Sequence, residues 1–352
     1  MKKFSVYLSL VLIAALLCGC AGTPVIYYSD CTCPTGSHTN TPTETKPTLT
    51  EGSLKTGLAI LADISGSENA THADYDVTLA AVLVDNDGVI HDCIIDSIGT
   101  KVTFDAAGAI TSDLSAQILT KNELGDDYGM KAYAGSKYEW YEQAAALAEY
   151  AIGKTVDELK NGAIDESGKA PAGSDLASTA TIYLGGYVSA IEAAVANAQH
   201  LGAQSGDTLK LASISSISSS TGATAEKNGT AQLDCDVTAL TVKDGRITSC
   251  CIDSLQAKVS FDTTGTITTD LTAPVQTKNQ LGENYGMVAW GGAIAEWNEQ
   301  AAAFASYVTG KTGAEVAGIA VSEGKPSDAD LSASVTIAIG GFQALIAKAL
   351  GE

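Results

Sequence analysis

The chain contains one block of sequence written twice. The string TKNELGDDYGM at residues 120–130 returns as TKNQLGENYGM at residues 277–287, an offset of 157. The same offset pairs Gly153–Thr155 with Gly310–Thr312, and after a two-residue deletion an offset of 155 pairs residues 175–182 with residues 330–337. A repeat of this length predicts two copies of one fold that carry the same function.

The first residues have the pattern of a signal peptide. Lys2 and Lys3 precede an apolar run over residues 6–17, which is too short for a stable membrane span. The run closes with Leu17-Cys18-Gly19-Cys20, which resembles a bacterial lipobox, although an ordinary cysteine within an apolar segment is the alternative. The pattern predicts cleavage after residue 19 and a lipid on Cys20, and more than one acyl chain there gives stable anchoring. We therefore expect the protein at the cell membrane, lipid-anchored on its extracytoplasmic face.

Four segments follow from these patterns. Residues 1–19 are the predicted signal peptide, and residues 20–52 form a lipidated N-terminus with a linker rich in Thr and Pro, including TGSHTNTPTETKPTLT. That composition has almost no apolar side chains to bury, so it predicts a disordered stalk. Residues 53–202 and 203–352 are two predicted domains, each of a size that buries its own core.

The charge excludes one class of partner. The chain has 20 basic and 41 acidic residues, a net charge of −21, and loss of Lys2 and Lys3 with the signal peptide makes it −23. An acidic surface repels nucleic acid, so we expect no nucleic-acid partner. Solubility alone explains the same charge.

Histidine and cysteine give no support for a metal or haem site. The four histidines are scattered, and no Cys-x-x-Cys pair occurs among the eight cysteines. Cys93 and Cys250 occupy equivalent positions in the two repeats, which favours small buried thiols over a redox pair. A bridge between Cys250 and Cys251 would be strained, but the spacing leaves it open.

Each repeat reads as strands first and helices second. Residues 76–84 and 89–96 flank a hairpin signal at Asn86-Asp87-Gly88, and residues 236–242 and 246–253 flank Asp244-Gly245. Apolar residues at helical spacing predict helices that begin near residues 139 and 296, and two more after residues 185–186 and 340–341. The fold class is α+β, with a β-meander followed by helices in each repeat.

The ordered motifs resemble a known family. Thr-Lys-Asn-x-Leu, Tyr-Gly-Met, Glu-Trp-x-x-Gln-Ala, Gly-Lys-Thr and Asp-Leu-x-x-x-x-Thr-Ile occur in this order in both repeats. This series is similar to the FMN-binding domain of pheromone-type lipoproteins, and it covers nearly all of both repeats. The resemblance implies that an extracytoplasmic FMN transferase joins the phosphate of FMN to a threonine hydroxyl.

The resemblance assigns the attachment sites. The family's modified threonine lies six residues after an aspartate, which gives Thr181 with Asp175 and Thr336 with Asp330. The family pattern has Gly-Ala before the threonine. The alanine is kept as Ala180 but becomes Val335, and the glycine is replaced by Thr179 and Ser334. Loss of that glycine predicts slower modification, particularly at Thr336. Without the resemblance, the aspartates would be read as turn caps and the threonines as ordinary strand residues.

Three other groups of residues are candidates near a flavin. Trp140 and Trp297, with neighbouring tyrosines, can stack on an isoalloxazine ring, although their helical spacing favours the core. Lys121 and Lys278 can face a phosphate or a reduced flavin, or lie as solvated turn lysines. Thr224, in the string STGATAE, is an alternative attachment site without the aspartate and without a counterpart in the first repeat.

The resulting hypothesis is a lipid-anchored electron carrier with two covalent FMN groups. Its implied partners are the FMN transferase, a membrane quinone or NADH dehydrogenase system as electron donor, and extracellular acceptors such as ferric iron or quinones. The alternatives are a non-redox ligand-binding lipoprotein, a precursor whose signal peptide is released as a pheromone, and a flavin-dependent surface reductase.

Overall fold

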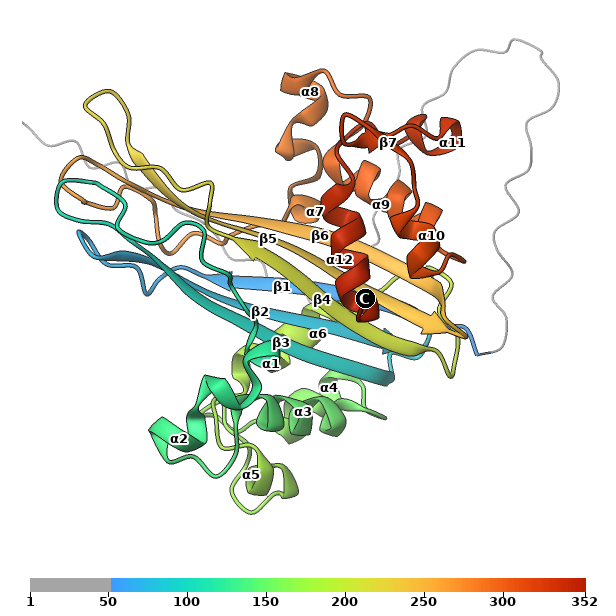
Figure 1. Ribbon diagram of the computed structural model, residues 1–352. Coiled ribbons are helices and arrows are strands. Elements are labelled where there is room, and N and C mark those ends of the chain that lie inside the picture. The colour runs from blue at the N-terminus through green and yellow to red at the C-terminus, as the bar shows by residue number, and fades with distance from the viewer. Residues whose placement is uncertain (1–51) are drawn as a thin grey trace, which may run out of the picture. The chain divides into compact units, whose positions relative to one another are not determined.

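The computed structural model describes residues 52–352, and these lie within one compact unit (Figure 1). The predicted signal peptide, the lipidation at Cys20 and the Thr/Pro-rich stalk fall on residues 1–51, outside the described part of the chain. From residue 52 onward, no helix has the length and apolar character needed to cross a membrane.

Each repeat begins with three antiparallel strands that pair in the order of the chain. In the first repeat these are β1 Lys55–Asp63, β2 His72–Val84 and β3 Ile90–Thr103, and in the second β4 Thr208–Ser216, β5 Gly229–Lys243 and β6 Arg246–Phe261. The second repeat also holds a small hairpin of β7 Val321–Ser322 and β8 Lys325–Pro326. Both predicted hairpins are present, and each has a register shift at the turn end of its second strand.

The helices follow the strands in each repeat. The first repeat has α1 Lys121–Leu124, the 3₁₀ helix η1 Gly125–Tyr128, α2 Met130–Ala134, α3 Trp140–Ala151, α4 Val156–Ala163, α5 Asp175–Thr179 and α6 Gly185–Ala196. The second has α7 Lys278–Leu281, η2 Gly282–Tyr285, α8 Met287–Gly291, α9 Trp297–Val308, α10 Gly313–Ala317, α11 Ala329–Ser332 and α12 Gly340–Leu350. The predicted α+β class is confirmed, and so are the four predicted helices, which are α3, α6, α9 and α12.

The two three-stranded sheets pack face to face and share one apolar core. Side chains from both sheets alternate through this core, which includes Tyr75, Val77 and Leu79 of β2 and Leu233 and Val237 of β5. Figure 1 shows the helices of the first repeat on one outer face of the pair of sheets and those of the second repeat on the other. Where the helices cover a strand, both sets of its side chains are largely apolar, as in residues 79–84 of β2, whereas toward the tips the outer side chains are polar and exposed, as is Lys101 of β3.

The tips of the two sheets are joined by aromatic and backbone contacts. The rings of Phe104 and Phe261 stack with centroids 4.0 Å apart and planes 2° from parallel. Around this pair, Ala70 N donates to Gly265 O at 2.7 Å, and Ala223 N donates to Gly108 O at 2.8 Å. The repeats therefore contact each other through buried side chains and through the backbone. The predicted division into domains at residues 202 and 203 stays a prediction.

The helices cover the outer faces of the sheets through two further cores. In the first, α3 and α6 bury Leu147 and Ile191 against the sheet, and in the second, Phe304 and Ile346 take the corresponding places. Gly57 of β1 is required by this packing, because a Cβ there would overlap the backbone carbonyl of Ala194 in α6. The strand and the helix thus approach backbone to backbone.

Candidate functional site

Thr181 and Thr336 take the same structural position in the two repeats. Each lies just after a short helix, α5 or α11, and four residues before the first residue of a longer one, α6 or α12. Thr181 is exposed and Thr336 is half-buried. Neither is a strand residue, so the reading of both as strand threonines is wrong.

A buried glutamine holds each threonine. The Oε1 atom of Gln143 in α3 accepts from the backbone N–H of Thr181 at 2.8 Å and from its Oγ1 hydroxyl at 3.1 Å. In the second repeat, Gln300 of α9 accepts from Thr336 N at 2.8 Å and from Thr336 Oγ1 at 3.3 Å. Both glutamines have 0% of their surface exposed.

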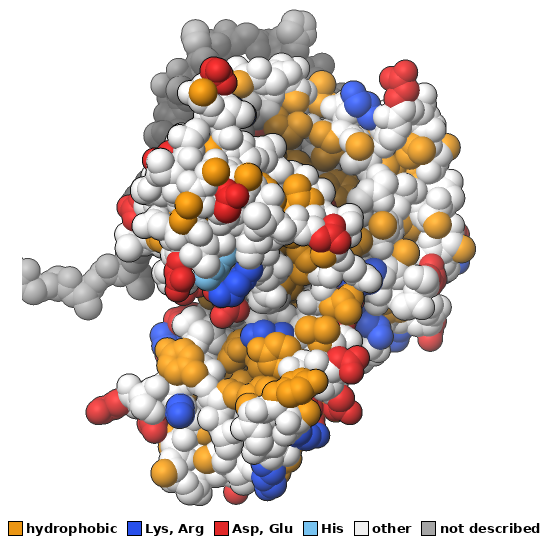
Figure 2. Space-filling view, turned by 60° about the vertical axis from the view of Figure 1, so that its left-hand side comes forward, with side chains coloured by type: hydrophobic (Ala, Val, Ile, Leu, Met, Phe, Trp, Pro, Cys, Tyr) orange, Lys and Arg blue, Asp and Glu red, His pale blue; other side chains and the backbone are white. Residues whose placement is uncertain are grey.

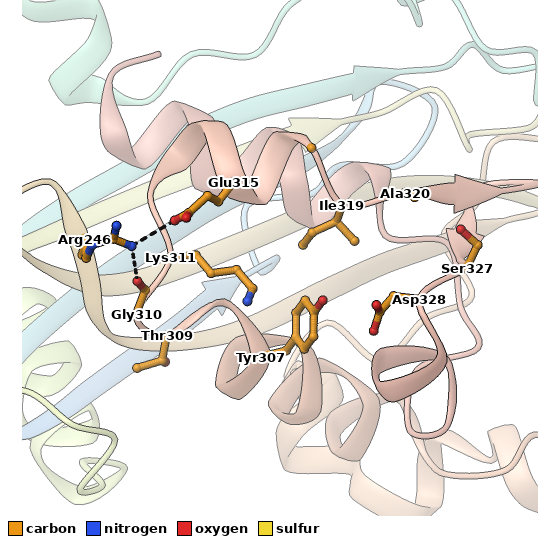
Figure 3. Close-up of a pocket in the computed structure, with 11 residues that line it drawn as sticks. Arg246, Tyr307, Thr309, Gly310, Lys311, Glu315, Ile319, Ala320, Ser327 and Asp328 are labelled. Atoms are coloured by element: carbon orange, nitrogen blue, oxygen red, sulfur yellow. Dashed lines mark hydrogen bonds and ion pairs between the residues drawn. The ribbon is translucent and has the colours of Figure 1, made fainter.

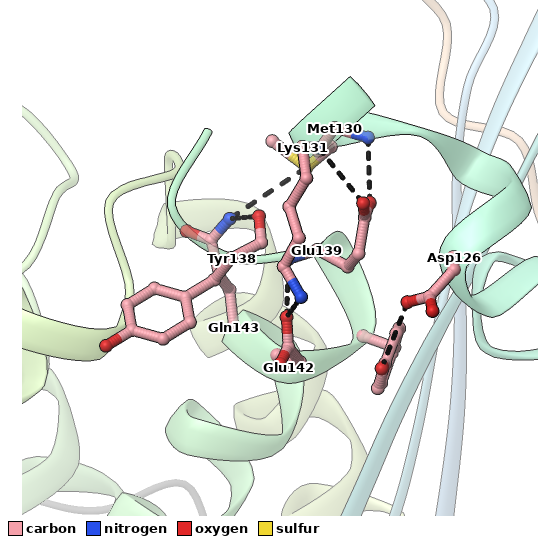
Figure 4. A network of polar contacts seen from close by, with 8 residues as sticks. Asp126, Met130, Lys131, Tyr138, Glu139, Glu142 and Gln143 are labelled. Atoms are coloured by element: carbon pink, nitrogen blue, oxygen red, sulfur yellow. Dashed lines mark hydrogen bonds and ion pairs between the residues drawn. The ribbon is translucent and has the colours of Figure 1, made fainter. Parts of the chain in front are cut away.

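A buried glutamate shapes the segment before each of these helices, and Figure 4 shows the one in the first repeat, Glu139. The Glu139 carboxylate accepts from Met130 N at 2.7 Å and Lys131 N at 3.0 Å, and so caps the start of α2. In the second repeat, Glu296 accepts from Met287 N and Val288 N at 2.8 and 3.0 Å. Anionic oxygens at the first N–H groups of a helix satisfy donors that have no partner within it. The repeated Glu-Trp-x-x-Gln motif is therefore a set of buried polar anchors on one helix.

The repeated Thr-Lys-Asn motif also has a local explanation. Thr120 is the N-cap of α1 in a reciprocal capping box with Glu123. The amide of Asn122 donates to Ile95 O at 2.9 Å, and its backbone N–H donates to the buried carboxylate of Asp96 at 3.1 Å. Burial raises the pKa of Asp96. Thr277, Asn279 and Asp253 repeat these contacts in the second half.

The tryptophans proposed as flavin contacts are part of the core. Trp140 is 2% exposed, and its Nε1 donates to the Tyr187 hydroxyl at 2.9 Å. The ammonium of Lys121 lies 5.2 Å from the Trp140 ring centroid and 5.4 Å from that of Tyr128. Trp297 is 6% exposed, with the Lys278 ammonium 4.7 Å from its ring centroid. A cation over each ring is a favourable packing contact.

Exposed aromatic rings lie elsewhere, at a pair of equivalent positions that the sequence patterns did not single out. Tyr133 of α2 is 90% exposed and Trp290 of α8 is 83% exposed. Each ring lies over a glycine with positive φ, Gly129 at 78° or Gly286 at 82°, where a Cβ would overlap the ring. Glycine is the residue that permits both this backbone conformation and this close approach. One face of each ring is supported by the glycine, while the side chain remains accessible to solvent.

The aspartates assigned with the threonines do not cap the short helices. The N-caps are Ser174 and Asp328, whose side chains accept from Ala177 N at 3.2 Å and from Leu331 N at 3.1 Å. Asp175 and Asp330 are the exposed first and second residues of α5 and α11. Their carboxylates remain accessible to another protein, and the reading of these aspartates as turn caps is wrong.

The departures from the family pattern cause no backbone strain. Among the described residues other than glycine, only Ala70, Asp244 and Glu323 have positive φ, so neither Thr179 nor Ser334 occupies a conformation that needs glycine. Ala180 and Val335 are both buried, with Ala180 packed beside α3 and Val335 beside α9. The larger valine is accommodated in the core rather than beside the threonine hydroxyl.

Thr224 lies in a loop between β4 and β5. Its Oγ1 accepts from Lys227 N at 3.1 Å, and its backbone N–H donates to Lys227 O at 2.8 Å. No counterpart of Gln143 contacts it among the hydrogen bonds of the described residues. Its setting therefore differs from that shared by Thr181 and Thr336.

Two cavities lie away from the threonines. The first is an open cleft of about 700 Å³ in the second repeat (Figure 3). Its lining includes Arg246, Tyr307, Lys311 and Asp328. Arg246 forms an ion pair with Glu315 at 3.0 Å. Figure 2 shows that apolar and charged side chains are interspersed over one face of the molecule. A polar cleft of this kind differs from the mostly apolar pockets that bind small molecules.

The second cavity, about 790 Å³, lies between the repeats and marks a break in their symmetry. Gln280 lines it, and the equivalent residue Glu123 in the first repeat forms an ion pair with Lys348 of α12 at 2.6 Å. The residue equivalent to Lys348 in α6 is Ala193. The Glu-to-Gln difference between the repeated motifs thus accompanies a lysine in α12 and an alanine at the equivalent position of α6.

The four cysteines of the described chain are free thiols. Cys93 and Cys250 are buried at equivalent positions, as predicted, and burial raises the pKa of each to about 12. Since the thiolate is the reactive form, we expect neither to be alkylated by iodoacetamide in the native protein at about pH 8. Peptide mapping after unfolding, which should label both, is the control. Rapid labelling of Cys93 or Cys250 in the native protein would contradict this burial.

Comparison with known proteins adds little to this geometry. No family model and no solved structure matches the chain. A segment of 42 residues is 55% identical to a protein named chlorophenol reductase from Desulfitobacterium hafniense. The match covers 12% of this chain and 13% of the length of that protein.

Proposed function

We propose that this protein is an extracytoplasmic, lipid-anchored electron carrier with FMN attached through phosphodiester bonds at Thr181 and Thr336. The observation that carries the proposal is the repeated setting of the two hydroxyls, each bound by a buried glutamine in the segment between a short helix and a longer one. An acceptor hydroxyl for another enzyme needs access and a defined position. Both threonines have these properties, which an arbitrary surface threonine lacks.

The neighbouring helices suit the phosphate of the attached group. α6 begins at Gly185 and α12 at Gly340, each four residues after its threonine. The first N–H groups of a helix and its dipole favour an anion. Asp175 and Asp330 then remain for recognition by the FMN transferase, since both are exposed and neither caps its helix.

Tyr133 and Trp290 are our preferred contacts for the isoalloxazine rings, in place of the buried tryptophans. Met130, at the start of α2, lies against the glutamine that holds Thr181, with its Sδ 3.9 Å from Gln143 Nε2. Tyr133 is one turn further along that helix, and its ring is accessible. Stacking on such a ring orients the flavin at little conformational cost.

The stacking has a measurable consequence, because an aromatic side chain against a flavin quenches its fluorescence. We expect Tyr133→Ala in the FMN-loaded protein to raise flavin fluorescence, and Trp290→Ala to do the same for the second flavin. Exposed Tyr183, two residues after Thr181, also lies over a glycine with positive φ, Gly168, and is therefore the competing contact in the first repeat. If Tyr133 is the stacking partner, Tyr183→Ala should leave the fluorescence unchanged. Unchanged fluorescence in both variants would place the rings elsewhere.

The electron-carrier role is tested by reduction and reoxidation. Electrons would come from a membrane quinone or NADH dehydrogenase system and leave to acceptors such as ferric iron or quinones. The FMN-loaded protein, reduced with dithionite, should be reoxidised by ferric citrate, and Thr181→Ala/Thr336→Ala protein should show no flavin signal. A loaded protein whose flavins stay reduced with both ferric citrate and a soluble quinone would contradict the carrier role.

A further inference from the structure

We propose that Gln143 and Gln300 are positioning residues for flavin attachment, which present the acceptor threonines to the transferase in one fixed orientation. This inference rests on the proposed attachment at Thr181 and Thr336. It adds a role for two buried amides in the transfer reaction itself.

The hydrogen bonds fix which end of each amide faces the threonine. Gln143 Nε2 donates to Tyr138 O at 3.2 Å (Figure 4). Its Oε1 therefore faces Thr181, where it also accepts from Ile182 N at 3.2 Å. Gln300 Nε2 donates to Ala295 O at 2.8 Å. A flipped amide would place donors against donors in both repeats, so the network admits one orientation.

The burial of these amides needs an explanation. Each glutamine lies on the apolar face of its helix, between Trp140 and Ala144 in α3 and between Trp297 and Ala301 in α9. A buried amide is costly unless its donors and acceptors are satisfied. Here the acceptor is satisfied by the backbone and hydroxyl of the threonine, so the amide and the threonine segment fix each other.

A second anchor holds the same segment from the apolar side. Leu176 and Ala180 of the first repeat are buried beside α3, and Leu331 and Val335 are buried beside α9. The threonine that follows is held at its backbone N–H by the glutamine, while its hydroxyl remains at the surface end of the segment. The segment is thereby fixed on both sides of the nucleophile.

The chemistry defines what the glutamine can contribute. Formation of a phosphodiester needs an activated donor, which we take to be a flavin nucleotide with a phosphoanhydride bond. Threonine Oγ1 attacks the phosphorus bearing the flavin, the Oγ1–P bond forms, and the anhydride P–O bond breaks as a nucleoside monophosphate leaves with the electron pair. An amide oxygen is too weakly basic to take the hydroxyl proton, so that proton goes to a base of the transferase.

The arrangement survives the reaction. The esterified oxygen no longer donates to the amide, but the backbone N–H groups of Thr181 and Ile182 still do. The buried Oε1 atom therefore keeps partners after modification, and no buried acceptor is left unsatisfied. The same holds for Gln300 through Thr336 N.

The test compares modification rates at the two sites in one protein. Full-length Gln143→Leu protein, which loses the acceptor oxygen, is incubated with FMN transferase and flavin adenine dinucleotide, and adducts at Thr181 and Thr336 are followed by peptide mass spectrometry. We expect Thr181 to be modified at least about tenfold more slowly, with Thr336 unchanged as the internal reference. Gln143→Glu, whose carboxyl we expect to be protonated at this buried position, keeps an acceptor oxygen for Thr181 and a donor for Tyr138 O, and it should restore most of the rate. Gln300→Leu should reverse the pattern.

A matched control separates positioning from loss of structure. Leu147→Val loosens the same buried face of α3 without touching the hydrogen bonds, and it should leave the Thr181 rate unchanged. If the Gln143→Leu protein does not fold, the rate of Thr181 modification is compared between Gln143→Glu, which keeps the acceptor, and Gln143→Met, which lacks it. Equal rates in these two variants would overturn the inference. Normal modification of Thr181 in folded Gln143→Leu protein would also overturn it. Absence of adducts in the unmodified sequence, with a control substrate labelled, would instead reject the proposed function.

Discussion

Thr181→Ala and Thr336→Ala should each remove one FMN adduct from protein that has been co-expressed with the transferase, and the double variant should carry none. The reason is that a phosphodiester requires the hydroxyl, and alanine removes it while keeping a side chain that fits the same backbone. Intact mass followed by peptide mapping measures the loss. The effect is all-or-none at each site, so it does not depend on the kinetics of the transferase.

The two sites should differ in occupancy. Thr181 is exposed, whereas Thr336 is half-buried. We therefore expect Thr181 to be filled first when transferase is limiting. Thr224→Ala is the control, because this loop threonine bonds within its own turn, and its replacement should leave the number of FMN adducts unchanged. An adduct that persists in the Thr181→Ala/Thr336→Ala protein and disappears with Thr224→Ala would contradict the assignment.

Phe261→Ala should lower the free energy of unfolding by about 3–5 kcal/mol, the usual cost of truncating a fully buried aromatic. Phe261 is 0% exposed and stacks on Phe104 of the other repeat. The variant therefore opens a cavity in the core that both sheets share, and the stack itself is lost. Chemical denaturation followed by tryptophan fluorescence measures the change.

The site of this cavity makes the result informative about the domains. Two single-tryptophan proteins separate the repeats. With Trp290 and Trp297 replaced by phenylalanine, the fluorescence of Trp140 follows unfolding of the first repeat. With Trp140 and Trp290 replaced, the fluorescence of Trp297 follows unfolding of the second. Phe261→Ala should shift both reporters together. Phe304→Ala, buried against the helices of the second repeat alone, is the matched comparison. If Phe261→Ala shifts the Trp297 reporter and leaves the Trp140 transition in place, the repeats unfold as separate domains.

The sequence predicted the repeated elements well where the signal was local. Asn86-Asp87-Gly88 marks the first hairpin, and the apolar spacing of Trp140, Ala144 and Leu147 marks α3. β1 has no strand signal of this kind, because its buried run of apolar residues lacks the alternation of apolar and polar residues that identifies a strand. The packing of one sheet against the other was not predicted. An apolar sequence pattern indicates that a face of a strand is buried, but it does not indicate which element covers that face.

The candidate site was predicted in part. The spacing of Asp175 and Thr181 came from family resemblance, and the structure puts Thr181 and Thr336 in equivalent places. Gln143 was visible only as an aligned residue. A polar side chain repeated on a buried helical face was the signal that could have identified it, because such a residue needs a specific partner. The partner, Thr181, lies 38 residues further along the chain, and sequence periodicity relates only residues within one helix or strand.

The number of flavins that remain with the denatured chain shows whether the attachment is covalent and at how many sites. The full-length protein, co-expressed with the transferase, is precipitated in acid and redissolved in guanidinium chloride, and its flavin absorbance is compared with its protein concentration. Covalent attachment at both threonines predicts two flavins per chain. A chain that releases all its flavin on denaturation, while a control substrate keeps its own, would contradict covalent attachment at Thr181 and Thr336.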